Sequence, residues 1–188
     1  MTSPLTVSEP YVFVTSNPDK LAEARRLAGP RLEGVELDLP EIQSLDMSTV
    51  LREKFNEAWR RLKRPLVVEE SGLELAALGG FPGPLVKWML QAAGAERIAR
   101  IGVALGDPRA RARCLLLYRD RKGVVLATGL AQGSLVLPPR GDHGFGFDPV
   151  FLPTGGSRTF GELSGAEKDL VSHRGRAWRD LLAKLAAR

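Results

Sequence analysis

Apolar and polar residues alternate along the chain in blocks that predict strands followed by helices. The apolar run at residues 11–15 predicts a short buried strand. The segment after it has the start signals of a helix, with Asn17 as a candidate N-cap and Pro18 at the first helical position. Gly29 and Pro30 are expected to end this helix. Its apolar face would be formed by Leu21, Ala24, Leu27 and Ala28.

The same pattern continues along the chain and predicts an α/β fold. Strands are expected at residues 35–42, 65–70, 112–120, 123–137 and 150–153. A helix is expected at about 48–63, with an apolar stripe of Leu51, Phe55, Ala58 and Leu62. Two later helices would bury Leu85, Trp88, Met89 and Ala92 in one case and Trp178, Leu181, Leu182 and Leu185 in the other. This alternation favours a long central sheet that contains mixed pairings.

The composition is that of an ordinary globular protein and excludes several classes of site. A chain of 188 residues suits one domain, or two lobes that share a core, and we assign residues 11–188 to a single domain after an N-terminal tail, 1–10. Its one cysteine, Cys114, excludes an intramolecular disulfide, and two His with one Cys argue against a zinc cluster. No apolar run is long enough for a membrane span or a signal peptide, so a cytoplasmic protein is expected.

The formal net charge of +5 makes an anionic partner plausible. Much of the excess is arginine, scattered along the chain and not gathered in one run. The basic segment 109–113 has no aromatic residue among its arginines, whereas a nucleic-acid surface preferably interleaves the two. A solvated surface is therefore the favoured interpretation, and no specific nucleic-acid partner is expected.

The first predicted strand–turn–helix junction is a candidate anion site. Thr15, Ser16 and Asn17 form the turn, and free N–H groups at a helix N-terminus attract negative charge. Lys20 lies in the first helical turn, where a cation is mildly unfavourable unless an anion such as a phosphate is added. A solvated lysine remains an equal alternative.

Two acidic residues, Glu69 and Glu70, end the predicted strand at 65–70 before a segment rich in Gly and Pro. Adjacent strand residues point to opposite faces, so at most one should face the site and the other should be solvated or hydrogen-bonded. A carboxylate at the end of a strand can bind a metal or orient water. With Glu41 as a second oxygen ligand the set suits Mg²⁺, although two solvated loop carboxylates would look the same.

Several other residues are candidates that depend on the fold bringing them together. Lys54 and Lys87 lie at the edges of predicted apolar helix faces, where a lysine can also simply extend into solvent. In the segment 143–151, Phe145 and Phe147 offer flat faces on which a base could stack, or they anchor the loop to the core. Just before the last helix the chain offers Lys168, Ser172, His173 and Arg174.

Taken together, these segments resemble the inosine triphosphate pyrophosphatases, the Ham1-like enzymes that remove non-standard purine nucleotides. The matching segments, in the family's order, are "TSNPDK", "DLPEIQ", "EKFNEAWR", "VVEESGLELAALGGFPGPLVKW", "GFGFDPVF" and "AEKDLVSHRGRA". They cover nearly the whole chain. The resemblance implies a long twisted mixed sheet flanked by helices, two lobes with an active-site cleft between them, a homodimer and Mg²⁺ as cofactor.

The resemblance also implies roles for individual residues. Glu41 and Glu70 would hold Mg²⁺, and Glu70 would be the catalytic carboxylate. Substrate contacts at the phosphate end are implied for Thr15, Ser16, Asn17, Lys20, Lys54, Ser71 and Lys87. The base would be cradled by Phe145, Gly146, Phe147 and Asp148, and its edge would be read by Lys168, His173 and Arg174.

The implied reaction converts a non-standard purine nucleoside triphosphate (ITP, dITP or XTP) and water to the monophosphate and pyrophosphate. One departure from the family pattern is Glu70, where the family usually has Asp. Three alternatives remain open: a pyrophosphatase for other altered nucleotides, a nucleotide sensor weakened by Glu70, and a basic nucleic-acid-binding module with a vestigial cleft.

Overall fold

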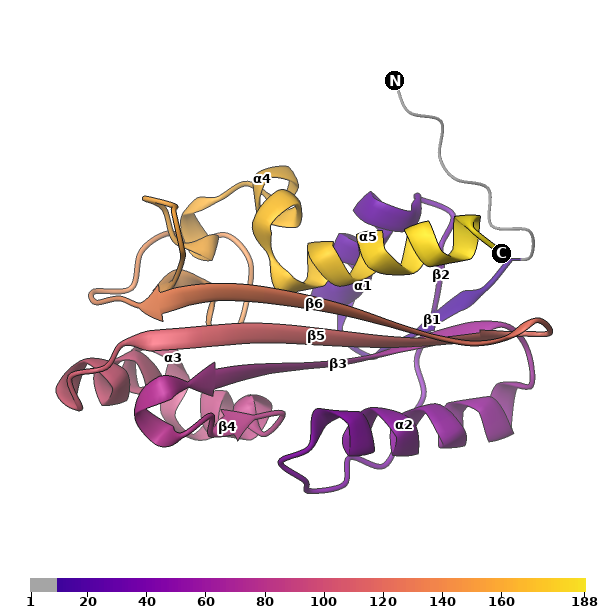
Figure 1. Ribbon diagram of the computed structural model, residues 1–188, viewed down its shortest axis with the longest axis horizontal. Coiled ribbons are helices and arrows are strands. Elements are labelled where there is room, and N and C mark those ends of the chain that lie inside the picture. The colour runs from indigo at the N-terminus through magenta and orange to yellow at the C-terminus, as the bar shows by residue number, and fades with distance from the viewer. Residues whose placement is uncertain (1–9) are drawn as a thin grey trace.

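The computed structural model describes residues 10–188 as one mixed sheet with helices on both sides (Figure 1). The predicted N-terminal tail, 1–10, lies outside the described residues except for its last residue. The strands are β1 Val12–Val14, β2 Glu33–Val35, β3 Leu66–Leu75, β4 Pro82–Gly83, β5 Arg109–Asp120, β6 Gly123–Leu135 and β7 Phe151–Pro153. The helices are α1 Pro18–Ala28, α2 Met47–Leu62, α3 Val86–Ala104, α4 Gly165–Val171 and α5 His173–Ala186, with 3₁₀ turns η1 Ala76–Leu78, η2 Asp148–Val150 and η3 Phe160–Glu162.

The sheet has the strand order β2-β1-β3-β5-β6-β7, with β4 paired to the far end of β3. β1 pairs in parallel with both β2 and β3, and the remaining pairs are antiparallel, so the predicted mixed sheet is confirmed. In Figure 1, α2 and α3 lie below the long strands, whereas α4 and α5 lie above them. Among residues 10–188, no helix is long and apolar enough to cross a membrane.

Three apolar clusters divide the molecule into two lobes. One lobe has a cluster around Phe13 and Trp178, on the side of α1 and α5, and a second around Leu51 and Phe55 of α2. The third cluster forms the other lobe, where Ile98 of α3 packs with residues from the opposite ends of β3, β5 and β6. Because the long strands run through both lobes, the cleft between them crosses the middle of the sheet. The predicted two-lobed fold is thus present.

The β1–α1 junction follows the sequence prediction closely. The side chain of Asn17 accepts hydrogen bonds from the backbone N–H groups of Asp19 and Lys20, at 2.9 and 3.0 Å. Pro18 occupies the first helical position, and Gly29 caps the C-terminus with φ 108°. The chain therefore turns sharply from strand to helix at the edge of the cleft.

Two predicted elements are wrong in their bounds or their orientation. The strand expected at 35–42 is only Glu33–Val35, and residues 36–46 cross the cleft without regular structure. On α3, Trp88 is 50% exposed, and the buried face includes Val86, Ile98 and Ala99 instead. The ring of Trp88 packs against the side chain of Lys87, whose Nζ lies 5.1 Å from the ring centroid.

β3 is longer than predicted, because it continues five residues past Glu70 to Leu75. The Gly/Pro-rich segment after it folds back as β4, which pairs with Leu73 and Glu74 of β3. This close pairing requires Gly72, since a Cβ there would lie 2.6 Å from the carbonyl oxygen of Gly83. The glycine that looks like a strand terminator in the sequence is thus a point of backbone contact within the strand.

Candidate active site

A single cavity of about 1010 Å³ occupies the cleft between the lobes. Its walls are the β1–α1 turn, the middle of β3, the irregular segment 36–42, the start of α3, the loop 145–148 and the start of α5. Every predicted site residue except Lys168 lines it: Thr15, Ser16, Asn17, Lys20, Glu41, Lys54, Glu70, Ser71, Lys87, Phe145, Gly146, Phe147, Asp148, His173 and Arg174. Lys54 comes from α2, so the fold gathers residues from seven separate segments around one space.

Glu69 and Glu70 lie inside β3 and not at its end. The parallel pairing of β1 with β3 stops at Val14 and Val68, so the next residues of β3 lie beyond the end of β1. Both carboxylates line the cavity. The expectation that only one of them faces the site is therefore wrong, although their side chains do bind partners from different helices.

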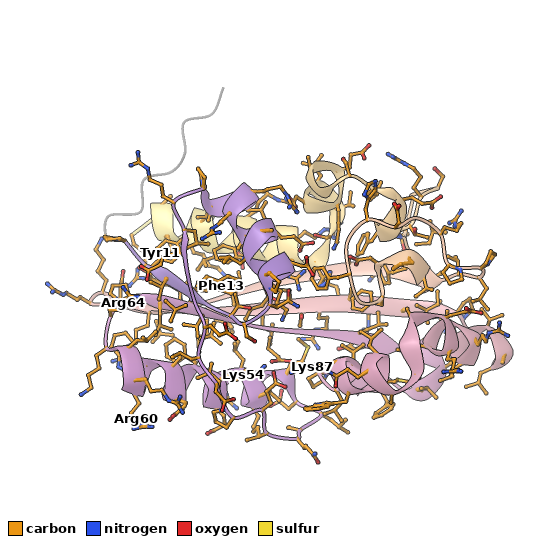
Figure 2. The ribbon with its side chains drawn as sticks, turned by 180° about the vertical axis from the view of Figure 1, so that it is seen from behind. Tyr11, Phe13, Lys54, Arg60, Arg64 and Lys87 are labelled. Atoms are coloured by element: carbon orange, nitrogen blue, oxygen red, sulfur yellow. The ribbon has the colours of Figure 1, made fainter. Side chains whose placement is uncertain are left out.

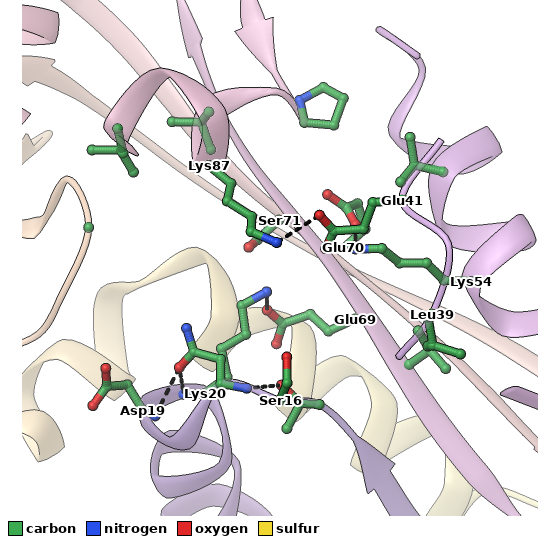
Figure 3. Close-up of a pocket in the computed structure, with 18 of the residues that line it drawn as sticks. Ser16, Asp19, Lys20, Leu39, Glu41, Lys54, Glu69, Glu70, Ser71 and Lys87 are labelled. Carbon is green, nitrogen blue, oxygen red and sulfur yellow. Dashed lines mark hydrogen bonds and ion pairs between the residues drawn. The ribbon is translucent and has the colours of Figure 1, made fainter. Parts of the chain in front are cut away.

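The β1–α1 turn has the features of an anion site. The backbone N–H of Asn17 donates to Thr15 Oγ1 at 3.1 Å, which orders the turn. Among residues 10–188, the backbone N–H of Ser16 has no hydrogen-bond partner. Lys20 points from the first turn of α1 to Glu69, with Nζ 3.1 Å from Oε1 (Figure 3). This ion pair accounts for a cation at the helix N-terminus even without a phosphate.

A cluster of two carboxylates and two lysines lies at the α2–α3 side of the cavity. Lys54 Nζ is 2.7 Å from Glu70 Oε2 and 3.1 Å from Glu41 Oε1, and Lys87 Nζ is 2.7 Å from Glu41 Oε2. Figure 2 shows Lys54 and Lys87 beside each other on the same side of the sheet, and Figure 3 shows both directed at the carboxylates. The cluster joins α2, the segment 36–42, β3 and α3.

The two carboxyl groups of this cluster differ in electrostatic environment. Burial raises the pKa of the Glu70 carboxyl above its usual value, and the nearby charge of Lys54 only partly offsets this. Burial also acts on Glu41, but hydrogen bonds and charge from Lys87 and Lys54 outweigh it and lower the pKa of that carboxyl. Glu70 thus has the higher proton affinity, as a group that accepts a proton from water requires.

The same cluster has a donor set that fits Mg²⁺. Glu41 and Glu70 supply hard carboxylate oxygens, and both already bind one shared cation, the ammonium of Lys54. Within residues 10–188, no group of three or more His, Cys, Asp or Glu side chains is arranged as a metal site. Mg²⁺ is usually held by one or two carboxylates together with substrate phosphates and water, so two carboxylates are enough.

The opposite end of the cavity is aromatic and cationic. Asp148 Oδ2 accepts hydrogen bonds from the Phe145 N–H at 2.8 Å and from Lys168 Nζ at 2.6 Å. The Phe145 ring is half-buried, and its centroid lies 4.9 Å from Lys168 Nζ and 5.3 Å from the Arg174 guanidinium carbon. Phe147 is 8% exposed and packs on Phe151. Of the two predicted aromatics, Phe147 therefore anchors the loop and Phe145 offers the more accessible ring.

His173 begins α5 and lines this end of the cavity. Burial and the charges of Arg174 and Lys168 hold the pKa of its imidazole well below the usual range, so the ring is neutral near pH 7. Among the described residues its buried Nδ1 has no hydrogen-bond partner. The start of α5 is held tightly on the sheet, because a Cβ at Gly129 of β6 would collide with the carbonyl oxygen of His173.

A family model described as the Ham1 family matches residues 11–184. The chain belongs to the Ham1 family. A dITP/XTP pyrophosphatase from Ignicoccus hospitalis is 38% identical over 185 residues, which cover 96% of this chain and 98% of that protein. An inosine triphosphate pyrophosphatase from Schizosaccharomyces pombe is 36% identical over 174 residues, with 90% and 92% coverage. The solved structure of a HAM1 protein from Coxiella burnetii is similar with a TM-score of 0.79, 26% identity and 95% and 98% coverage.

The resemblance inferred from six sequence segments is thereby confirmed. The position of Glu23 in this site could not be inferred from those segments. Glu23 of α1 is buried at 5% exposure and binds both Lys168 and Arg174. The apolar pattern of the sequence does not distinguish Glu23 from a solvated residue. Its spacing of three residues from Lys20 does place it on the same side of the helix as that candidate. Lys168 is itself buried and does not line the cavity.

Proposed function

We propose that this Ham1-family chain hydrolyses non-standard purine nucleoside triphosphates (ITP, dITP and XTP) to the monophosphate and pyrophosphate. The observation that carries the proposal is the division of one cavity into two chemically different ends. Carboxylates and lysines gather at one end, and an aromatic ring beside cations and a neutral histidine lies at the other. The relatives from Ignicoccus hospitalis and Schizosaccharomyces pombe are named for this activity, as a dITP/XTP pyrophosphatase and an inosine triphosphate pyrophosphatase.

At the phosphate end, the chain offers neutral donors and three lysines. The N–H of Ser16 and the hydroxyl groups of Thr15 and Ser71 are placed to contact phosphate oxygens, while Asn17 orders the turn. Lys20, Lys54 and Lys87 are each paired with a carboxylate in this structure. A triphosphate would compete for these ammonium groups, so the lysines would change partners as the substrate enters. Phosphoryl-type transfer depends mainly on such positioning and charge stabilisation.

Glu70 is the proposed catalytic base. Its carboxylate would take a proton from a water molecule, the water oxygen would bond to the α-phosphorus, and the bond to the bridging oxygen of pyrophosphate would break in line. The raised pKa of Glu70 suits this proton transfer. Glu41 and Glu70 would hold Mg²⁺, which supplies positive charge to the phosphate oxygens when bound. Lys54 and Lys87 would stabilise the charge that develops on the leaving pyrophosphate.

The base end would select purines with a 6-oxo group. Inosine and xanthosine present an acceptor there, whereas adenine presents a 6-amino donor. Arg174 carries only donors and the neutral imidazole of His173 can present one N–H, and both line the cavity, whereas Lys168 is buried and does not line it. Phe145 would stack on the base. A site built on such hydrogen bonds can discriminate by roughly 10⁴-fold against a substrate that leaves its groups unpaired.

The same proposal includes a homodimer as the working assembly, which sedimentation of the purified chain would test. The nucleic-acid alternative is less well supported, because the arginines of the basic segment 109–113 are paired with carboxylates. Arg109 binds Asp107, and Arg111 and Arg113 both bind Glu74. The sensor alternative rests on Glu70 alone and predicts that ITP binds without turnover.

The experiment that tests the proposed reaction is product analysis in water enriched in oxygen-18. ITP is incubated with the chain and Mg²⁺, and the products are separated and weighed by mass spectrometry. The proposal predicts IMP and pyrophosphate, with the heavy oxygen in IMP, because water attacks the α-phosphorus. IDP and orthophosphate, or label in pyrophosphate, would contradict it.

A further inference from the structure

The helix α3 is broken at Gly94. This residue has φ 76° and ψ 162°, which is outside the helical region and in a part of conformational space that essentially only glycine adopts. The break divides α3 into a first half, residues 86–93, and a second half, residues 95–104. The Arg97 side chain donates a hydrogen bond to the carbonyl oxygen of Ala93 at 3.4 Å, across the break. A Cβ at Gly94 would meet no atom within 4 Å, so the glycine is required by its backbone angles and not by packing.

The break lets both halves of α3 bury their apolar side chains in the same lobe. In an unbroken helix, Ala95 would lie about 180° and Ile98 about 120° around the axis from Val86, because successive residues turn by about 100°. A continuous α3 would therefore direct its two apolar faces to different sides. In the structure both faces pack on one apolar cluster, with Val86, Met89 and Leu90 from the first half and Ala95, Ile98 and Ala99 from the second.

Only the first half of α3 reaches the cavity. Lys87 Nζ lies 2.7 Å from Glu41 Oε2 at the phosphate end (Figure 3), whereas no residue of 95–104 lines the cavity. The second half is held in the core, where Ile98 and Ala99 are fully buried. The Lys87 side chain is 54% exposed, so few packing contacts direct it. The backbone angles at Gly94 therefore determine where the Lys87 ammonium points relative to a fixed support.

We propose that Gly94 is a positioning residue for the reaction, because the break that it forms directs Lys87 at the phosphate end of the cavity. This inference rests on the function proposed above, in which Lys87 stabilises the leaving pyrophosphate. An alanine at position 94 would be strained at these backbone angles. Since the second half of α3 is anchored in the core, the chain would relieve this strain by moving the first half, and the Lys87 ammonium would move with it.

A matched control lies just after the end of the same helix. Gly106 has φ 75° and, like Gly94, would have no atom within 4 Å of an added Cβ. It does not line the cavity. Gly106→Ala therefore introduces backbone strain without changing the direction of the segment that carries Lys87. Both alanine variants should lower the urea concentration at the midpoint of unfolding, which reports the strain in each.

The experiment compares wild type, Gly94→Ala, Gly106→Ala, Lys87→Ala and the double variant of Gly94→Ala with Lys87→Ala. Calorimetric titration with Mg²⁺ present measures the binding of pyrophosphate and of IMP, and steady-state kinetics gives kcat/KM for ITP. For Gly94→Ala we expect the pyrophosphate affinity and kcat/KM to fall about tenfold or more, as the loss of a hydrogen bond to a charged group implies. The affinity for IMP should not change, because IMP lacks the leaving phosphates. In the double variant, Gly94→Ala should cause no loss beyond that of Lys87→Ala, because residues that act through one another are not additive.

Three results would overturn the inference: wild-type pyrophosphate affinity in Gly94→Ala, an equal loss in Gly106→Ala, or losses that multiply in the double variant. If Gly94→Ala does not fold, insertion of a second glycine after Gly94 replaces it. The insertion avoids strain but frees the direction of the first half of α3, so an unchanged pyrophosphate affinity would again overturn the inference.

The binding measurement also separates this inference from the proposed function. If the wild type binds pyrophosphate but does not hydrolyse ITP, the proposed reaction fails, and weaker pyrophosphate binding by Gly94→Ala would still support the positioning role. If the wild type binds neither pyrophosphate nor ITP, both the function and this inference are wrong.

Discussion

The ammonium of Lys54 lies 2.7 Å from Oε2 of Glu70, so a cation from α2 rests on the carboxylate proposed to activate water. The pair is buried, with 13% and 8% of the two side chains exposed. Lys54 opposes the rise in the pKa of Glu70 that burial causes, which favours the ionised form needed in a base. In the proposed reaction Lys54 also contacts a substrate phosphate. Glu70 must remain ionised when Lys54 does so, because a protonated carboxyl cannot act as the base.

Replacing Glu70 with glutamine should abolish most of the turnover while preserving the fold. The amide cannot accept a proton from water, and loss of a general base typically costs about 10²- to 10⁴-fold in rate. Pyrophosphate release under saturating ITP is the measurement. Glu74→Gln is the matched control, since Glu74 lies on the same strand, binds Arg111 and Arg113 and does not line the cavity. Equal rates in wild type and Glu70→Gln would remove Glu70 from the mechanism.

Shortening Glu70 to aspartate, the usual residue of the family, should reduce the rate and not improve it. In this chain the longer side chain reaches Lys54 from the middle of β3, and Asp would withdraw the carboxylate by about a bond length. A displacement of 1 Å can cost about 100-fold in rate. The measurement is kcat for ITP in Glu70→Asp, compared with that of the wild type. A faster variant would show that the backbone does not compensate for the longer side chain.

Removal of divalent metal should stop the reaction. Treatment with a chelator is expected to abolish pyrophosphate release, and added Mg²⁺ should restore it, because two carboxylates and phosphate oxygens form a typical Mg²⁺ donor set. Glu41→Gln removes one of these ligands and should raise the Mg²⁺ concentration needed for half-maximal rate. Full activity in chelator, or an unchanged Mg²⁺ requirement in Glu41→Gln, would contradict the assigned metal site.

Asn17→Ala should affect both stability and substrate binding. Its side chain caps α1, and loss of an N-cap costs about 1 kcal/mol in the free energy of unfolding, measurable with urea. The turn also forms part of the phosphate end, so the KM for ITP should rise. Asp46→Ala removes the corresponding cap of α2 outside the cavity and should lower stability alone. An increase of KM in both variants would mean that the effect comes from helix stability.

The neutral, buried imidazole of His173 should make the protein less stable in mild acid. Below pH 6.5 the unfolded chain binds a proton on this imidazole, whereas the folded protein does not, because its pKa is held well below that value. The free energy of unfolding should therefore fall by about 1 kcal/mol between pH 7.5 and 5.5 from this group. The raised pKa values of Glu70 and Asp148 have the opposite effect, because these carboxyl groups bind protons more readily in the folded protein and so stabilise it in acid. The contribution of His173 must therefore be isolated with a variant. In His173→Asn this part of the pH dependence should vanish, and an unchanged slope would mean that His173 is protonated in the folded state.

Local signals in the sequence were sufficient for the elements that depend on neighbouring residues. Asn17 and Pro18 mark the start of α1, and the turn between β5 and β6 follows from residues 120–123, where Asp120 accepts hydrogen bonds from the N–H groups of Lys122 and Gly123. These features rest on capping and turn chemistry within four residues. For the same reason the β1–α1 part of the site could be located without the structure.

Features that depend on tertiary contacts could not be predicted in this way. Gly72 looks like the end of a strand, but it allows β4 to approach the middle of β3. Trp88 fits the helical period of α3 and yet lies on its exposed side. Glu23 binds partners 145 and 151 residues away in the sequence, and no local pattern distinguishes such a carboxylate from a solvated one.

The measurement that tests the central claim most directly is the specificity constant kcat/KM for ITP, dITP and XTP against ATP and GTP in the presence of Mg²⁺, with Glu70→Gln assayed in parallel. We expect the 6-oxo, non-standard purines to be preferred over ATP by about 10²-fold or more, since mismatched hydrogen bonds are strongly penalised. The preferred turnover should be lost in Glu70→Gln. Similar constants for ITP and ATP, or ITP binding without any pyrophosphate release, would contradict the proposed function.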